Sequence, residues 1–118
     1  MSTEEQELWR RYQQEFDEDA RDGLVQYHMP FVYYLAGQMR RRTGRRVDID
    51  DLVSAGALGL LHAVERFDPS RGFVFSTFAT RRIRGAMLDE VRRSSLVKRG
   101  ATLKARRIGE ARTRVENR

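Results

Sequence analysis

The chain has 118 residues, enough for one compact domain with a modest hydrophobic core. It contains no cysteine, which excludes disulfides and thiolate metal sites, and no window approaches the roughly 18 apolar residues that a membrane span needs. Lys and Arg total 23 against 17 Asp and Glu, so the formal net charge of +6 favours a polyanionic partner. We expect a cytoplasmic protein without a membrane partner.

The excess of positive charge lies at one end of the chain. Residues 1–30 carry three basic and eight acidic groups, whereas residues 81–118 carry thirteen basic and four acidic groups. We therefore expect the polyanion to bind the C-terminal part. The N-terminal part is either solvated or placed to repel the same polyanion.

Two helices are predicted in the first third of the chain. Apolar side chains recur at helical spacing over residues 8–16 and again over residues 20–42, with Asp17 near the start of the second helix. Pro30 is expected to kink this helix or divide it in two. The arginine cluster at 40–46, with its glycine, favours a helix end. An alternative that the sequence leaves open is that this cluster contacts phosphate.

A third helix is predicted over residues 49–67, with Asp48 as its N-cap. Gly56 and Gly59 lie inside this helix, where each costs about 1 kcal/mol relative to alanine. The cost indicates that another helix approaches closely at these positions, either within this domain or from a partner.

The rest of the chain is predicted to be a turn at 68–72 followed by two helices. Ser76 is a plausible N-cap for a helix over 77–93, whose outward side carries arginines about once per turn. Serines and a glycine indicate a turn near 94–101. A basic helix with few apolar residues is then expected over 103–115.

Residues 71–84 set three phenylalanines directly against a run of arginines. Aromatic rings stack on unpaired bases of any identity, and guanidinium groups neutralise phosphates, so this pattern is typical of a binding site for single-stranded nucleic acid. The alternative is a buried aromatic cluster beside a solvated basic helix, and composition alone favours neither.

No catalytic or metal-binding constellation is found in the sequence. His28 and His62 have no second histidine or cysteine at ligand spacing and are most simply structural. Asp48, Asp50 and Asp51 lack the glycine-spaced loop of calcium sites, and capping explains the first and third. We expect no enzyme activity, no cofactor and no metal.

Three segments together closely resemble bacterial RNA polymerase sigma factors, and most of all the flagellar and sporulation group of alternative sigma factors. These segments read DDLVSAGALGLLHAVERFD at 50–68, RGFVFSTFA at 71–79 and RIRGAMLDE at 82–90. The resemblance is dense over residues 27–93 and weaker on both sides. It implies an all-α fold, a helical bundle of about four to six helices.

The resemblance also implies three sets of functional residues. The set that would bind the coiled coil of the polymerase beta-prime subunit comprises Asp50, Asp51, Ser54, Leu58 and Leu61. The set that would stack on flipped bases of the non-template strand comprises Phe73, Phe75, Thr77 and Phe78. The set that would meet DNA at the upstream edge of the minus-ten element comprises Arg81, Arg82, Arg84, Gly85, Leu88 and Arg92.

The sequence departs from the family pattern at three places. Arg81 and Arg82 stand where primary sigma factors carry paired tryptophans, which identifies an alternative sigma factor. Ser54 and Ala55 replace the polar pair of primary factors, and the stretch 95–99 lacks the tryptophan and proline usual in this group. The chain also lacks the helix-turn-helix that reads the minus-thirty-five element, so we expect a segment of a longer protein; a natural short protein is the alternative.

We therefore expect two parts: residues 1–95 as the second sigma domain, and residues 96–118 as the start of a third domain or linker. The expected function is core-polymerase binding with recognition and melting of the minus-ten element, and an anti-sigma factor is a further expected partner. One alternative is a sigma-like protein that binds core polymerase or an anti-sigma factor without reading promoters. The other is a helical repressor that prefers double-stranded DNA.

Overall fold

The computed structural model describes residues 1–44 and 46–116, and within this part the chain is all-α. The helices are α1 (Thr3–Glu15), α2 (Glu18–Arg42), α3 (Ile49–Arg66) and α4 (Phe75–Glu116), with a 3-10 turn η1 (Pro69–Arg71) between the last two. The predicted fold class and helix number are thus confirmed. No helix in the described part is long and apolar enough to cross a membrane.

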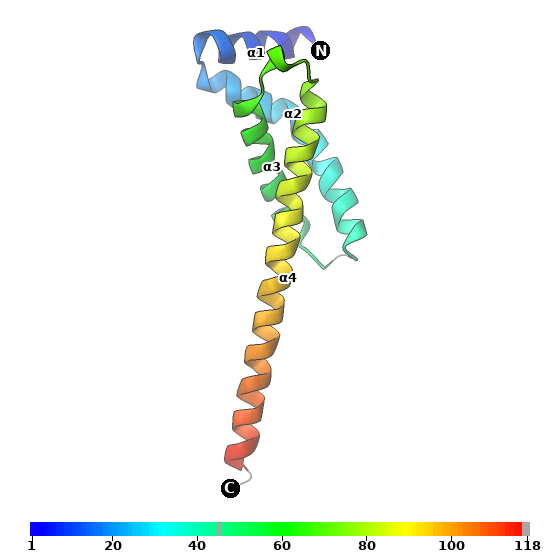
Figure 1. Ribbon diagram of the computed structural model, residues 1–118, viewed down its shortest axis with the longest axis vertical. Coiled ribbons are helices and arrows are strands. Elements are labelled where there is room, and N and C mark those ends of the chain that lie inside the picture. The colour runs from blue at the N-terminus through cyan, green and yellow to red at the C-terminus, as the bar shows by residue number, and fades with distance from the viewer. Residues whose placement is uncertain (45, 117–118) are drawn as a thin grey trace.

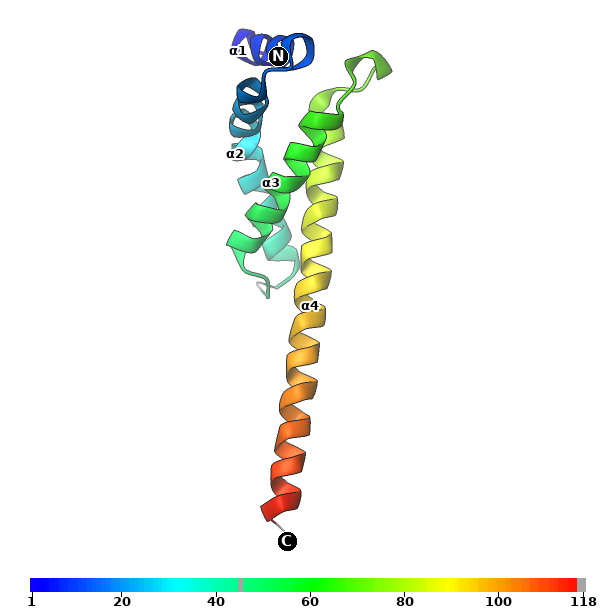
Figure 2. The same ribbon diagram turned by 90° about the vertical axis from the view of Figure 1, so that its left-hand side faces the viewer.

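Helices α2, α3 and α4 form the body of the molecule, and α1 lies across one end of it (Figures 1 and 2). The Gln13 side chain of α1 donates a hydrogen bond to the carbonyl oxygen of Phe67, which follows α3. The second half of α4 extends far beyond the other helices as a single rod, which gives the molecule extents of 74 × 27 × 22 Å. The turn between α3 and α4 is therefore held next to α1, while the C-terminal rod is surrounded mostly by solvent.

Short-range signals set the helix boundaries where the sequence predicts them. The Asp17 carboxylate accepts hydrogen bonds from the backbone N–H groups of Asp19 and Ala20 at the start of α2. Asp48 caps α3 in the same way, through the N–H of Asp50. Gly44, with φ of 68°, follows the end of α2 in a conformation that favours glycine.

Helix α2 runs without a break through Pro30, so the predicted division into two helices does not occur. Proline removes one backbone hydrogen bond, and a helix survives this loss when its two halves are both packed. Leu24 on one side of Pro30 and Val32 and Leu35 on the other are all buried in the core. Pro30 itself is exposed.

Helix α4 differs from the prediction at its start and in its middle. It begins at Phe75 rather than at Thr77, so Ser76 is not its N-cap. It also continues through 94–101, where we predicted a turn, and includes the helix predicted over 103–115. The serines and glycine of this stretch cost at most about 1 kcal/mol each in a helix, and no proline interrupts the backbone hydrogen bonds. The predicted boundary between residues 95 and 96 therefore lies inside a continuous helix.

The two glycines of α3 are explained by contact with α4 inside this domain. A Cβ atom on Gly59 would lie 2.7 Å from the carbonyl oxygen of Arg82 and 3.1 Å from Cβ of Ala86. A Cβ on Gly56 would collide with the Met87 and Val32 side chains. The predicted close approach is confirmed, and its partner is α4 rather than a second protein.

Candidate nucleic-acid and polymerase interfaces

Phe75 lies in the core, so its predicted role as an exposed stacking residue is not supported. Its side chain is only 3% exposed. The ring centroid lies 4.9 Å from that of Trp9, 5.2 Å from that of Phe67 and 4.9 Å from that of His28. To stack on a base, Phe75 would have to leave this cluster, which joins α1, α2 and the start of α4.

Phe73 and Phe78 remain at the surface beside arginines. Phe73 is 62% exposed, and Phe78 is half-buried with the guanidinium carbon of Arg82 4.9 Å from its ring centroid. Both phenylalanines line a pocket of about 340 Å³, which we call the phenylalanine pocket. Its lining residues are Arg66, Phe67, Asp68, Arg71, Phe73, Phe78 and Arg82. Thr77 is exposed nearby in sequence but does not line the pocket as the described residues form it.

The η1 turn holds Phe73 away from the core. The Asp68 carboxylate accepts hydrogen bonds from the Ser70 backbone N–H and hydroxyl, which lower the pKa of Asp68. Gly72 follows with φ of 79°, a conformation that other residues rarely adopt. The chain thereby turns between Phe67 and Phe75, which are both packed in the aromatic cluster, and leaves Phe73 in solvent. The predicted stacking set does not include Arg66, which lines the phenylalanine pocket because α3 ends there.

The predicted DNA-facing arginines form an exposed ridge along the first part of α4. Arg81, Arg84, Leu88 and Arg92, which we call the arginine ridge, are all exposed. Gly85, between them, is half-buried, and a Cβ there would meet nothing within 4 Å. Ile83 and Met87 on the opposite side of the helix are fully buried against the core. Arg82, also in the predicted set, lies to one side of this ridge, with its guanidinium carbon 4.9 Å from the centroid of the Phe78 ring.

The residues predicted to bind polymerase lie on the exposed side of α3. Asp51, Ser54 and Leu58 line a groove of about 520 Å³ between α3 and α4, the α3–α4 groove, and Leu58 is 54% exposed. Asp50 is exposed and Leu61 half-buried, but neither lines the groove as the described residues form it. Nothing in the predicted set of polymerase-binding residues indicates that α4 supplies the other wall of the groove. That wall comprises Ala86, Asp89, Glu90 and Arg93.

The α3–α4 groove is acidic with one paired cation. The Arg93 guanidinium lies 2.6 Å from the Glu90 carboxylate, and this hydrogen bond, with a smaller contribution from Asp51, raises the pKa of Arg93. Asp51 and Asp89 add two further carboxylates next to the exposed Leu58. A cationic partner with an apolar patch fits this arrangement. Within the described part of the chain, no three His, Asp or Glu side chains are grouped to hold a metal ion.

His28, which supports Phe75, is expected to make stability depend on pH. Its Nε2 lies 3.3 Å from a Glu5 carboxylate oxygen, but burial outweighs this charge and lowers the pKa of His28. The unfolded chain then binds the proton more readily, so the free energy of unfolding should decrease as pH falls through about 6.5. Urea denaturation at pH 7.5 and 5.5 should show a smaller acid loss for His28→Gln than for the unaltered chain. Equal losses would contradict this assignment.

The described residues thus form an all-α domain with an acidic groove, a phenylalanine pocket and an arginine ridge. Residues 24–96 match the family model of Sigma-70 region 2. The chain therefore belongs to the sigma-70 family, whose members are transcription initiation factors rather than enzymes.

Three relatives confirm the predicted resemblance to flagellar-type alternative sigma factors. The chain is 38% identical to the RNA polymerase sigma-D factor of Bacillus subtilis over 118 residues, all of this chain and 46% of the relative. It is 42% identical to RNA polymerase sigma factor FliA of Yersinia enterocolitica over 83% of this chain and 43% of the relative. It is 43% identical to FliA of Escherichia coli over 77% of this chain and 38% of the relative. The chain thus spans less than half the length of these relatives.

Proposed function

We propose that this chain is the part of an alternative sigma factor that binds core RNA polymerase and recognises and melts the promoter minus-ten element. The observation that carries the proposal is the phenylalanine pocket, where two solvent-accessible phenylalanines and three arginines meet beside the arginine ridge. The α3–α4 groove shares no lining residue with this pocket. Polymerase and DNA could therefore be held at the same time.

Melting would be driven by capture of exposed bases. A base extruded from the duplex stacks on Phe73 or Phe78, and such stacking contributes about 1–3 kcal/mol per base. Arg71 and Arg82 supply positive charge for the adjoining phosphates, and the Thr77 hydroxyl can donate a hydrogen bond. No bond is made or broken, since binding of unpaired bases shifts the equilibrium toward the melted state.

The arginine ridge would hold the double-stranded edge of the same element. Arg81, Arg84 and Arg92 are exposed and can reach phosphates or guanine edges. The open space above Gly85 allows the DNA to approach the α4 backbone. These contacts would fix the position of the base pair next to the melted segment.

The α3–α4 groove would bind the beta-prime subunit of core polymerase. Asp51 provides an exposed carboxylate, and Ser54 and Leu58 provide a polar and an apolar contact on the same face of α3. Asp50 and Leu61 stay in the proposed interface as flanking residues. An anti-sigma factor is proposed as a further partner from family membership alone.

Alanine substitution of Phe73 or Phe78 should weaken binding of the non-template strand by about 1–3 kcal/mol each, because each removes a stacking surface. Binding of core polymerase should stay unchanged, since neither side chain lines the α3–α4 groove. Fluorescence anisotropy with a labelled single strand measures the first quantity, and a pull-down titration with core polymerase measures the second.

Asp51→Ala is the matched reciprocal control. It should weaken core binding and leave single-strand binding unchanged, because Asp51 is exposed on α3 and lies outside the phenylalanine pocket. If the phenylalanine variants bind the strand as well as the unaltered chain while core binding persists, the chain is a sigma-like protein that occupies polymerase without reading promoters. Exposed phenylalanines argue against this alternative, because a protein that does not read promoters would not need them. Since Phe75 is buried, two such residues, Phe73 and Phe78, carry this argument rather than three.

A further inference from the structure

We propose that the α1–α2 turn, formed by Phe16 and Asp17, is a second contact for core RNA polymerase, in which the Phe16 ring enters an apolar pocket on a basic surface of that protein. The proposal rests on the proposed function in taking core polymerase as the partner. It adds a contact beyond the α3–α4 groove, and neither residue of the turn belongs to the predicted core-binding set. Phe16 is 83% exposed, the highest value among the large apolar side chains of the described part.

The backbone conformation of Phe16 is unfavourable for this residue. Its φ of 55° and ψ of 35° are left-handed, and no other non-glycine residue in the described part has a positive φ. At the end of a helix this conformation is usually taken by glycine, because a Cβ atom lies too close to the following carbonyl oxygen. The ring does not repay this cost inside the domain, since it lies in solvent. Such strain at an exposed apolar side chain points to a contact outside the domain.

Hydrogen bonds hold the turn on both sides of Phe16. The Asp17 carboxylate accepts hydrogen bonds from the Arg11 guanidinium at 2.6 and 3.0 Å, in addition to those from the start of α2. The Asp17 backbone N–H donates to the carbonyl oxygen of Arg11 at 3.2 Å. Because the backbone is fixed before binding, little conformational entropy is lost when the ring enters a pocket. A fixed, exposed aromatic ring is typical of the residues that anchor protein interfaces.

The turn adjoins an exposed row of residues on α3 that begins at the α3–α4 groove. This row, which we call the α3 row, recurs at spacings of three and four and so follows one side of the helix. Its residues are exposed except for one that is half-buried, and they are Asp51, Ser54, Leu58, Leu61 and Glu65. The first three line the groove. In Figure 1 the α1–α2 turn and α3 lie on the same side of α4.

Two interactions connect the end of the α3 row to the α1–α2 turn. The Gln13 side chain, near the end of α1, donates a hydrogen bond to the carbonyl oxygen of Phe67. Burial raises the pKa of Tyr12, and the nearby charges of Glu65 and, more weakly, Glu18 raise it further. Glu65 at the end of the row and Glu18 beside the turn are therefore both close to Tyr12. A partner that extends from the groove along α3 reaches the turn without crossing another helix.

The charge around the turn favours a basic protein and excludes DNA as the partner. Residues 1–30 carry eight acidic and three basic groups. Glu15, Glu18 and Asp19, which flank the turn, are all exposed, and Glu15 is paired with Arg10. Phosphates are repelled by such a surface, whereas a basic surface is attracted to it. The partner that fits the acidic α3–α4 groove is likewise cationic with an apolar patch, so one protein satisfies both sites.

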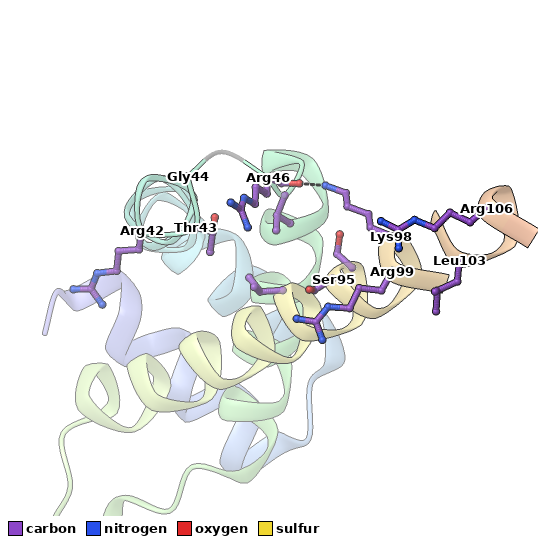
Figure 3. A pocket seen from close by; sticks show the side chains of 12 residues that line it. Arg42, Thr43, Gly44, Arg46, Ser95, Lys98, Arg99, Leu103 and Arg106 are labelled. Atoms are coloured by element: carbon purple, nitrogen blue, oxygen red, sulfur yellow. Dashed lines mark hydrogen bonds between the residues drawn. The ribbon is translucent and has the colours of Figure 1, made fainter. Parts of the chain in front are cut away.

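A second copy of this chain is the other basic partner that can be considered. The cleft drawn in Figure 3, between the α2–α3 loop and α4, is lined by five arginines and lysines and by no acidic residue. Of its apolar side chains, Val47 is buried, Val91 is half-buried and only Leu103 is well exposed. One exposed leucine does not form a pocket for a phenyl ring. Core polymerase is therefore favoured over self-association.

The test is a titration of the labelled full chain with core polymerase, followed by fluorescence anisotropy. Phe16→Gly should weaken core binding about tenfold, as loss of an interface anchor does. The same change should raise the midpoint of thermal unfolding by about 3 °C, because glycine adopts the left-handed conformation freely. A residue with only a structural role would not give these opposite effects. Glu18→Gln/Glu65→Gln should weaken core binding about fivefold and make it less dependent on salt.

Two control variants remove the same groups elsewhere. Tyr33→Ala removes an aromatic ring that is 60% exposed on α2. Glu4→Gln/Glu7→Gln removes two exposed carboxylates from the first half of α1, away from the turn. Both variants should bind core polymerase as the unaltered chain does. Circular dichroism of each variant establishes that the helices are retained.

Unchanged core binding by Phe16→Gly, or a joint loss of core binding and thermal stability, would overturn the proposal. Equal losses in the turn and control variants would overturn it as well. Sedimentation velocity tests the second copy: self-association that Phe16→Gly abolishes, with core binding unchanged, would assign the turn to another copy of the chain. Asp51→Ala separates the proposal from the proposed function. If it weakens core binding and Phe16→Gly does not, the groove stands and the turn fails; the reverse result leaves only the turn.

Discussion

Replacing Phe75 by alanine is expected to destabilise the domain by about 3–5 kcal/mol, because the change leaves a cavity in a buried aromatic cluster. Phe75 is 3% exposed and contacts the rings of Trp9, Phe67 and His28, which come from three different parts of the fold. Urea denaturation followed by tryptophan fluorescence measures this loss. Trp9 is the only tryptophan, and its ring centroid lies 4.9 Å from that of Phe75.

Phe73→Ala is the matched control, since it makes the same substitution two residues away at a side chain that is 62% exposed. It should change the free energy of unfolding by less than about 0.5 kcal/mol while weakening single-strand binding. The account would be contradicted if Phe75→Ala left stability unchanged and weakened strand binding. In that case Phe75 would be the stacking residue that its place in the family motif implies.

Gly59→Ala is expected to destabilise the domain by about 1–3 kcal/mol through overpacking between α3 and α4. The new Cβ would lie 2.7 Å from the Arg82 carbonyl oxygen, a backbone atom that cannot move without shifting α4. Such a shift would also move Phe78 and Arg82, which both lie on α4, relative to Phe67 at the end of α3 and so distort the phenylalanine pocket. The variant should therefore lose strand binding in addition to stability. Denaturation and strand-binding titrations measure the two effects.

Gly37→Ala provides the control for helix propensity. Gly37 lies inside α2, and a Cβ there would meet nothing within 4 Å. This substitution should stabilise the domain, by up to about 1 kcal/mol, because alanine is the better helix former. Equal stability changes for the two glycine variants would show that α3 and α4 are not as close in solution as the structure has them.

The predictable part of this fold is the part that depends on neighbouring residues in sequence. Asp17 and Asp48 cap helices because their short carboxylates reach the next backbone N–H groups, and this needs no tertiary information. The glycines at 56 and 59 also correctly indicated a close helix. Which helix approaches them is a tertiary fact, and the sequence left both possibilities open.

The burial of Phe75 was missed because the start of α4 was placed two residues too late. Phe75, Ala79, Ile83 and Met87 follow one another at spacings of four and form a single buried face once the helix begins at Phe75. The signal was therefore present in the sequence. The resemblance to the family's aromatic motif instead favoured an exposed Phe75 that stacks on a base.

The continuity of α4 through 94–101 could not be read from local preferences. Serine and glycine lower helix stability only slightly, so a break and a continuous helix differ by a small free energy. The bond from Lys98 to the loop at Arg46 joins residues that are far apart in sequence.

The most direct test of the account is fluorescence anisotropy of a labelled non-template minus-ten strand, taken from a promoter that the sigma-D relative uses, with a scrambled strand as reference. The titration is made with the chain alone and with added core polymerase. We predict selective binding of the promoter strand that strengthens when core polymerase is present. Association with core polymerase without any preference between the two strands would contradict the account.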